Sequence, residues 1–393
     1  MNSWKKLQIG TAISFNPTES ISKGKVAKKI PMGSLTEFQR KINSFEYCKY
    51  KSGPKFRNGD TIMAKITPCL ENGKTAFVDV LDEEEIAFGS SEFIVLRKTP
   101  NTDPMFIYYL AISPTFRKRA ISCMEGTSGR KRVSEKTLKY FELNFPPIEN
   151  QKQIAKVLSD LDTKIELNNK INTELEAMAK LIYDYWFVQF DFPDENGKPY
   201  KSSGGKMVYN EELKREIPEG WGFDIIGNLL AKEQLGGKTL SSEYLVSGSI
   251  PIIDQSTNFI CGYTDDKAKR IVTKVPRIVF GDHTRILKLI NFDFARGADG
   301  TQVLLSKEER VPQHFFYHSL LKIDLSNYGY ARHFKFLKDT KTIMPSIDIA
   351  NQFEEKAKVW YDMVWANKRQ NQKLAELRDW LLPMLMNGQV RVN

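Results

Sequence analysis

The residues of this chain that could perform hydrolysis are considered first. Pro193 and Asp194, followed by Glu212 and Lys214, have the order of a metal-dependent nuclease motif. That chemistry needs carboxylates and a lysine on adjacent strands around a metal ion. Here the residues lie in a segment rich in glycine, serine and proline, and we therefore expect no nuclease site in this segment.

Three further motifs resemble sites for nucleotides or methyl transfer. Residues 73–75 and 237–239, both Gly-Lys-Thr, end like phosphate-binding loops, but Pro68 and Lys232 stand where the first glycine would be. Residues 144–147 (Asn-Phe-Pro-Pro) differ from the Asn-Pro-Pro-aromatic sequence of adenine methyltransferases, and no glycine-rich cofactor loop precedes them. The sequence therefore predicts neither a phosphate cradle nor a methyl-transfer centre.

Histidine and cysteine residues are the candidates for metal binding. His314 and His318 have a zinc-like spacing on an expected helix, but no cysteine or glutamate partner is evident nearby, so we expect them to be structural. The four cysteines are too few to staple 393 residues and show no Cys-x-x-Cys spacing: Cys48, Cys69, Cys123 and Cys261. Since the sequence also predicts no signal peptide and no membrane span, we expect a cytoplasmic protein.

Basic residues point to a different kind of chemistry. Residues 1–147 carry 24 Lys and Arg against 15 Asp and Glu, and residues 221–346 carry 17 against 13. The net charge of +10 is therefore concentrated in two separate blocks. A basic excess in a folded segment is typical of a polyanion-binding protein, although such an excess can also serve solubility alone.

The two basic blocks belong to an internal repeat. Residues 136–188 align without a gap with residues 335–387 at a constant offset of 199. Nine positions match, among them Pro146 with Pro345 and Asn168 with Asn367. Upstream, residues 4–10 and 221–227 share a Trp, an Ile and a Gly at the same spacing. The chain therefore has the order block, helix, block, helix.

Two long helices are the elements that must position the blocks. Apolar residues recur at alternating steps of four and three, which is typical of a coiled-coil seam. The seam residues that we expect to pair are Ile154, Leu158, Ile165, Asn168, Asn172 and Leu175 in the first helix, and Val364, Asn367, Asn371, Leu374, Leu381 and Leu385 in the second. The alternative is two unrelated amphipathic helices, each packed only on its own block.

We expect the two helices to run antiparallel, because a compact block between them should return the chain toward its start. The only register that pairs every seam position has partner numbers that sum to 539. It joins Asn168 to Asn371 and Asn172 to Asn367, and buried asparagines of this kind fix register. Leu161 then faces Arg378, which requires that the guanidinium reach outward to solvent.

The predicted fold is α+β: two similar globular α/β domains separated by two long helices that form an antiparallel coiled coil. We place the first block at residues 1–147 and its helix at 148–188. A connection follows at 189–220, then the second block at 221–346 and the second helix at 347–393. Short β-rich runs bounded by Gly, Asp and Pro, at 61–64, 92–96, 277–280 and 301–305, and an expected helix late in each block, at 104–111 and 312–321, support mixed α/β blocks.

The architecture resembles that of Type I restriction-modification specificity subunits over essentially the full chain. Residues 161–168 with 185–187 are similar to that family's central conserved region, and residues 204–208 with 217–221 to its linker. Residues 280–285 and 297–300 are similar to a recurrent recognition-domain type.

The resemblance implies two target-recognition domains that read the halves of a split site in double-stranded DNA. It also implies helices that dock two methyltransferase (modification) subunits, together with restriction (motor) subunits. No cofactor is implied in this chain, since S-adenosylmethionine, ATP and Mg²⁺ are used by the partner subunits. The alternative is a nuclease or methyltransferase that acts alone with a fused recognition module.

The expected DNA-binding residues are mainly basic side chains in loops, where they could contact phosphates or base edges. In the first block they are Lys65, Arg130, Lys131 and Arg132, of which the last three end the glycine-flanked loop 126–132. In the second block they are His283, Thr284, Arg285, Arg296, Arg332, His333 and Lys335. We expect no metal site and no catalytic residue.

Overall fold

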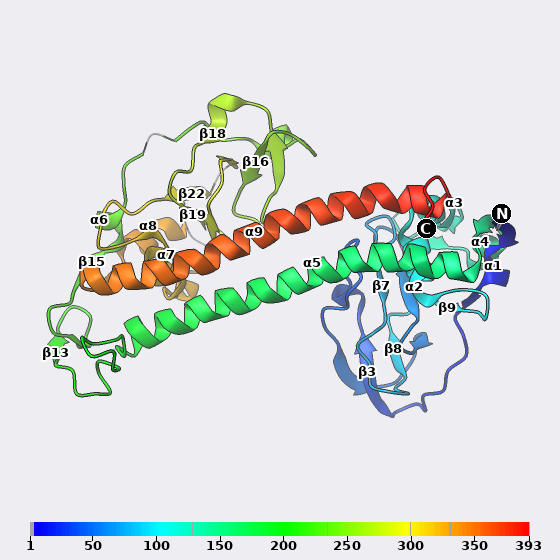
Figure 1. The fold of residues 1–393 in the computed structure, drawn as a ribbon, viewed down its shortest axis with the longest axis horizontal. Helices are drawn as coiled ribbons and strands as arrows, with labels where there is room; N and C mark the ends of the chain where they lie inside the picture. The colour runs from blue at the N-terminus through cyan, green and yellow to red at the C-terminus, as the bar shows by residue number, and fades with distance from the viewer. Residues whose placement is uncertain (1–3, 128, 234, 299, 330–331, 393) are drawn as a thin grey trace. The chain divides into compact units, whose positions relative to one another are not determined.

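The structure is a computed structural model that describes residues 4–127, 129–233, 235–298, 300–329 and 332–392. The chain divides into two compact units (Figure 1). Unit 1 consists of Met1–Asn168 with Arg369–Asn393, and unit 2 of Asn169–Lys368. Each unit therefore combines one globular α/β block with a part of each long helix.

The two long helices are α5 (Ile148–Tyr183) and α9 (Ile347–Met386), and α5 ends in a π-helical turn, Asp184–Val188. Each begins directly after a proline-containing dipeptide, as expected. A proline disfavours the helical conformation of the residue before it, so the helix does not extend further toward the N-terminus. Figure 1 shows the two helices side by side, and the contacts within each unit make them antiparallel. The predicted fold class, two α/β domains with an antiparallel helix pair, is confirmed.

The globular block of unit 1 is built on two four-stranded sheets, with strand orders β2-β9-β6-β7 and β4-β3-β8-β5. All neighbours are antiparallel except β3 and β8, which are parallel. The strands are β2 (Ile13–Phe15), β3 (Val26–Ile30), β4 (Glu46–Lys49), β5 (Lys55–Phe56), β6 (Thr61–Ala64), β7 (Thr75–Phe77), β8 (Ala87–Gly89) and β9 (Phe93–Lys98). The expected runs at 61–64 and 92–96 are thus strands of one sheet.

Helix α2 (Pro104–Ile112) joins the sheets of unit 1 to the long helices. It begins where the carboxylate of Asp103 accepts a hydrogen bond from Phe106 N and where Pro104 fits the first turn. Helix α3 (Pro114–Ser122) follows directly and is capped by Ser113. Apolar side chains of α2 share one core with Leu158 of α5 and Leu385 of α9. The block is therefore packed on both long helices.

Unit 2 has a similar block with sheets of order β17-β16-β21-β18 and β20-β19-β22. Its strands are β16 (Ile250–Ile253), β17 (Gly262–Thr264), β18 (Arg270–Ile271), β19 (Arg277–Gly281), β20 (Leu287–Ile290), β21 (Phe294–Arg296) and β22 (Thr301–Leu304). Helix α7 (Gln313–Leu321) packs with Phe353 and Ala357 of α9 in the main core of the unit. The predicted late helix of this block is thus confirmed.

The short repeat motif that ends in glycine has a packing reason. In each unit a short strand, paired with a second strand, leads directly into a short helix, and this helix contacts a second short helix. These elements are β1 (Lys5–Gln8), β12 (Glu142–Phe145), α1 (Ile9–Ala12) and α4 (Glu135–Tyr140) in unit 1, and β15 (Gly222–Ile225), β23 (Lys341–Met344), α6 (Ile226–Leu229) and α8 (His333–Asp339) in unit 2. A side chain at Gly10 would lie 2.8 Å from Cβ of Lys139, and one at Gly227 would lie 3.2 Å from the carbonyl oxygen of Lys338. Glycine is needed for this close approach.

Residues 189–220, which we expect to connect the two blocks, contain ordered structure. It contains the hairpin of β13 (Met207–Asn210) and β14 (Arg215–Pro218). Phe192 stacks on Tyr200 with 4.6 Å between ring centroids and on Trp221 with 4.8 Å. Three widely spaced aromatic rings thus order a stretch whose glycines and serines alone suggest a loop.

Two features are absent among the described residues. No helix among them combines the length and the apolar composition needed to cross a membrane. Within the same residues, no group of three or more His, Cys, Asp and Glu side chains is arranged to hold a metal ion.

Candidate DNA interface and helix surfaces

The basic loop of the first block is the tip of a hairpin. Strands β10 (Met124–Glu125) and β11 (Arg132–Val133) pair antiparallel, and Arg130 and Lys131 lie between them in the chain. Gly126 and Gly129 have φ angles of 121° and 80°, which favour glycine. The side chains of Arg130 and Lys131 are exposed at this tip. The hairpin therefore holds the charged side chains of Arg130 and Lys131 in solvent, at the end of two paired strands.

The base of this hairpin is held by the neighbouring strand end. Thr67 N donates to the carbonyl oxygen of Lys131 at 3.0 Å, and Val133 N donates to that of Lys65 at 2.9 Å. Arg132 forks onto the carboxylate of Glu92, with Nε–Oε2 of 2.9 Å and Nη2–Oε1 of 2.8 Å. The hydrogen bond from Arg132 lowers the pKa of Glu92 below its usual value. The fold thus brings all four expected residues together, but Arg132 is engaged within the protein.

In the second block, His283, Thr284 and Arg285 form the turn between β19 and β20. Thr284 Oγ1 donates to the carbonyl oxygen of Gln255 at 2.7 Å, and His283 N donates to the Gln255 side chain at 3.0 Å. The side chains of Thr284 and Arg285 are exposed. Gln255 was not singled out from the sequence, since it lies 28 residues from His283, in the loop after β16.

Helix α8 is attached to the same turn through Asp282. The buried carboxylate of Asp282 accepts a hydrogen bond from Phe334 N at 2.8 Å, and its carbonyl oxygen accepts from His333 N at 2.9 Å. Arg332 and Lys335 are exposed beside it. The turn and the start of α8 thus form one surface with three exposed cationic side chains, those of Arg285, Arg332 and Lys335.

Two expected residues of the second block have more enclosed positions. His333 is 2% exposed, and its ring nitrogens lie 2.9 Å from the carbonyl oxygen of Asp282 and 3.1 Å from that of Gly329. In this structure its ring braces the turn rather than faces solvent. Arg296 is half-buried, and its Nε donates to the carbonyl oxygen of Gly236 at 3.1 Å. Two motif residues, Ser128 and Asp299, lie outside the described residues.

The expected asparagine layers lie in the seam of the long helices. In unit 1, Asn168 Nδ2 donates to Oδ1 of Asn371 at 2.8 Å. In unit 2, Asn367 Nδ2 donates to Oδ1 of Asn172 at 2.9 Å. Both pairs have residue numbers that sum to 539. The other expected seam residues are buried or half-buried: Ile154, Leu158, Ile165, Leu175, Val364, Leu374, Leu381 and Leu385.

The layer at Arg378 differs from our expectation. Arg378 does not reach outward: its side chain is buried, and Nη1 donates to Oδ1 of Asp162 at 2.8 Å. The carboxylate of Asp162 is also buried and accepts a second hydrogen bond from the hydroxyl of Tyr109 at 2.7 Å. Our expectation was wrong because it paired Arg378 with Leu161 alone and took no account of the neighbouring carboxylate.

The residues of the excluded chemical motifs have structural contacts. His314 Nδ1 lies 2.7 Å from Oε1 of Glu354, and His318 Nε2 lies 3.1 Å from the hydroxyl of Tyr361. Both histidines are buried against α9. Asp194 accepts backbone hydrogen bonds from Asn196 and Lys198 within its own turn. Each of these polar groups is therefore satisfied by a neighbouring group of the fold.

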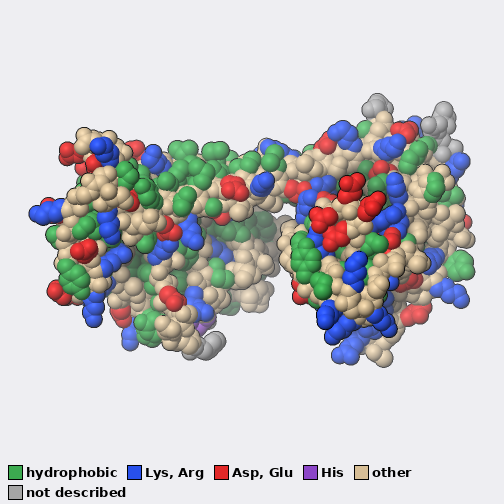
Figure 2. All heavy atoms as spheres, turned by 90° about the horizontal axis from the view of Figure 1, so that it is seen from below, with side chains coloured by type: hydrophobic (Ala, Val, Ile, Leu, Met, Phe, Trp, Pro, Cys, Tyr) green, Lys and Arg blue, Asp and Glu red, His purple; other side chains and the backbone are tan. Residues whose placement is uncertain are grey.

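Exposed apolar residues on the long helices occur at equivalent places of the repeat. Met178 and Leu181 of α5 belong to unit 2, and Leu377 and Trp380 of α9, each 199 residues later, belong to unit 1. All four are exposed, Leu181 by 66% and Trp380 by 57%. Figure 2 shows hydrophobic side chains gathered along the long helices. Exposed apolar side chains in a cluster are typical of an interaction surface.

The chain has two α/β blocks and an antiparallel helix pair, and each block has an exposed basic surface. This architecture is the one expected of a DNA-recognition protein with two reading domains. Residues 6–177 match the family described as Type I restriction modification DNA specificity domain. The MjaIX specificity subunit of Methanocaldococcus jannaschii is 26% identical over 310 residues, which are 73% of this chain and 69% of that protein. The HindI specificity subunit of Haemophilus influenzae is 23% identical over 99% of this chain and its own full length.

A solved structure agrees in fold. The Type I restriction-modification S subunit from M. genitalium superposes with a TM-score of 0.59 at 16% identity, over 97% of this chain and 96% of its own. Together these matches support a Type I restriction-modification specificity subunit that recognises DNA sequence. In such a complex the specificity subunit is the non-catalytic component.

Proposed function

We propose that this chain reads a bipartite site in double-stranded DNA, with residues 1–147 reading one half and residues 221–346 the other. The observation that carries this proposal is the presence, in each unit, of an exposed basic loop anchored on a rigid sheet. In the first block the loop presents Arg130 and Lys131, and in the second the surface around Arg285 presents three cations. Phosphate contacts from such residues would supply affinity, and base-edge contacts the specificity.

The long helices would dock two modification subunits, one for each unit. The support is the repeat itself, because Met178 and Leu181 in unit 2 correspond to Leu377 and Trp380 in unit 1. Equivalent apolar surfaces suit two copies of one partner. Catalysis in the cytoplasm would then belong to the partners, which use S-adenosylmethionine, ATP and Mg²⁺, with restriction subunits joining for cleavage.

The experiment that tests this function is to map N6-methyladenine in a genome where the chain is produced with its modification subunit. We expect one bipartite motif. Exchange of residues 221–346 for the corresponding block of another specificity subunit should change one half of that motif and leave the other half intact. A change in both halves would contradict the assignment of one half-site to each block.

A second experiment separates this function from an enzyme that acts alone. The purified chain without partners, given DNA and either S-adenosylmethionine or Mg²⁺, should neither methylate nor cut. Product formation at a rate that scales with the concentration of the chain would favour the alternative, a nuclease or methyltransferase with a fused recognition module.

Docking is tested by the stoichiometry of the complex. Leu181→Asp and Trp380→Asp each place a charge in one of the two apolar pairs, and each should reduce the bound modification subunits from two to one. The double variant should bind neither copy, as measured by light scattering. Lys156→Asp, at an exposed position of α5, is the matched control and should retain both. Two bound subunits in the double variant would exclude this surface.

A further inference from the structure

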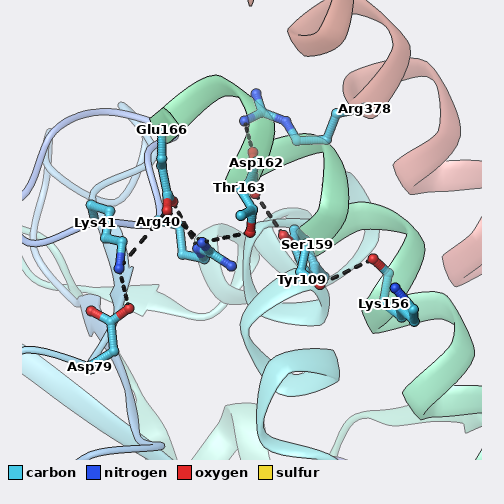
Figure 3. A network of polar contacts seen from close by, with 10 residues as sticks. All are labelled: Arg40, Lys41, Asp79, Tyr109, Lys156, Ser159, Asp162, Thr163, Glu166 and Arg378. Carbon is cyan, nitrogen blue, oxygen red and sulfur yellow. Dashed lines mark hydrogen bonds and ion pairs between the residues drawn. The ribbon is translucent and has the colours of Figure 1, made fainter. Parts of the chain in front are cut away.

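A buried polar network in unit 1 connects the globular block to both long helices (Figure 3). Its centre is Asp162 of α5, whose two carboxylate oxygens have different partners. Oδ2 accepts from the hydroxyl of Tyr109 on α2 at 2.7 Å, and Oδ1 accepts from Nη1 of Arg378 on α9 at 2.8 Å. One carboxylate therefore holds three elements together: the helix of the block and the two helices of the seam.

A second attachment lies one helical turn further along α5. Arg40 comes from the segment between β3 and β4, and its guanidinium forks onto Glu166, with Nε–Oε1 of 3.0 Å and Nη2–Oε2 of 2.6 Å. Arg40 is buried, and its carbonyl oxygen accepts a hydrogen bond from Phe77 N of β7 at 3.0 Å. Arg40 is thus hydrogen-bonded to the sheet of the block through its backbone and to Glu166 of α5 through its side chain.

The polar contacts fix the orientation of the block on the long helices, at an interface that is otherwise apolar. Side chains such as Leu158 and Leu385 pack the block on both helices, so the ion pairs are not needed for adhesion. Replacement of a buried ion pair by apolar residues is often neutral or stabilising, whereas its best-attested role is to select one geometry. A two-pronged arginine–carboxylate contact is strongly directional. The fork of Arg40 on Glu166 and the hydrogen bond of Tyr109 to Asp162 come from different parts of the block and lie one turn apart on α5, so together they define the angle of the block on the helices.

The equivalent places in unit 2 have different chemistry. At the offset of 199, Tyr361 and Trp365 replace Asp162 and Glu166, and Ala179 stands at the place of Arg378. Tyr361 makes one hydrogen bond to His318, and Trp365 packs on Phe259 with 5.3 Å between ring centroids. At these places the second block has aromatic packing, whereas the first block has charged contacts in addition to its apolar core. Repetition of the fold alone therefore does not account for the network.

We propose that Arg40, Asp162, Glu166 and Arg378 are positioning residues that set the orientation of the first block on the helices, and thereby the spacer length that the subunit accepts between its half-sites. This inference rests on the proposed function. None of the four residues belongs to the hairpin of β10 and β11 that carries Arg130 and Lys131, so we expect their replacement to leave the choice of bases in the first half-site unchanged.

The test uses the full chain with its modification subunits and DNA duplexes that carry the methylation motif with the native spacer or with a spacer changed by a single base pair. Wild type should bind and methylate only the native spacing. Glu166→Gln and Asp162→Asn remove the charge with little change of shape. Each should increase methylation at the altered spacings on the order of tenfold, because a charge-assisted contact no longer discriminates between two orientations. The preferred bases of both halves should stay unchanged.

Two further variants make the test specific. Arg40→Glu combined with Glu166→Arg restores an ion pair of reversed polarity and should restore the native spacer preference, whereas either change alone should relax it. Asp160→Asn breaks an exposed pair with Lys156 on the same helix and is the matched control. Glu166 is partly exposed, so Glu166→Gln should fold even if Asp162→Asn does not, and its melting temperature reports this directly.

The possible results separate the inference from the proposed function. Unchanged spacer selectivity in folded Glu166→Gln, equal loss of methylation at all spacings, or altered base preference would each overturn the positioning role while leaving DNA recognition by two blocks intact. Failure of the wild-type complex to methylate any bipartite site would overturn the proposed function itself.

Discussion

Replacement of both Arg130 and Lys131 by alanine should weaken DNA binding in a way that depends steeply on salt. Each Lys or Arg on a phosphate contributes about 0.9 to the slope of log K against log salt concentration. The two exposed side chains should together lower that slope by about 1.8. Between about 50 and 200 mM salt, the ratio of wild-type to variant affinity should then shrink about 12-fold. Addition of Arg132→Ala should lower the slope by less than either exposed cation, because Arg132 already pairs with Glu92.

The assay is fluorescence anisotropy of a labelled duplex with the full complex, repeated over a series of salt concentrations. The control is Lys152→Ala with Lys156→Ala, which removes the same charge from exposed positions of α5. If this control lowers the slope as much as the tip variant, or if the tip variant leaves the slope unchanged, the phosphate contacts lie elsewhere and the reasoning from the hairpin is refuted.

Two predictions concern the stability of the units, both measured as the midpoint of urea unfolding. Asn168→Leu should destabilise unit 1 by about 1–3 kcal/mol, because Oδ1 of Asn371 loses the hydrogen bond that Asn168 Nδ2 donates across the seam. The double change of both asparagines to leucine should recover that loss, and equal midpoints for the single and double variants would contradict the pairing. Burial lowers the pKa of His318 to about 3. The unfolded chain therefore takes up the proton as pH falls below about 6.5, and unit 2 should lose at most about 1.4 kcal/mol per pH unit between those values. His318→Gln should reduce this loss of stability at low pH, and an unchanged pH dependence would show that another group causes it.

Much of the fold was predictable because its signals are local. The alternation of apolar residues in steps of four and three predicted α5 and α9. The compact block between the helices predicted that they run antiparallel, and the spacing then predicted a register that places Asn168 beside Asn371, as the structure has them. The pattern could not predict the fate of Arg378, because its partner Asp162 lies 216 residues away and next to the seam position that we had paired with it.

The candidate DNA surfaces also include residues that the sequence identified and contacts that it did not. The run of cations flanked by glycines identified the loop with Arg130 and Lys131 as a candidate DNA-binding loop, and the fold leaves both side chains exposed. The sequence did not separate Arg132, which is held by Glu92, from its two exposed neighbours. Nor did it indicate that His333 is enclosed by the turn it braces.

The sequence by itself determined the order of the elements, the repeat and the register of the helices, because each follows from the spacing of residue types along the chain. Only the tertiary structure decided which charges are available to a ligand and which hold the fold. The ion pair of Arg40 with Glu166 joins residues 126 positions apart, and that of Arg132 with Glu92 joins residues 40 apart. Whether a charged side chain meets solvent or a buried partner depends on strands and helices that fold together from distant segments, and no local pattern encodes that choice.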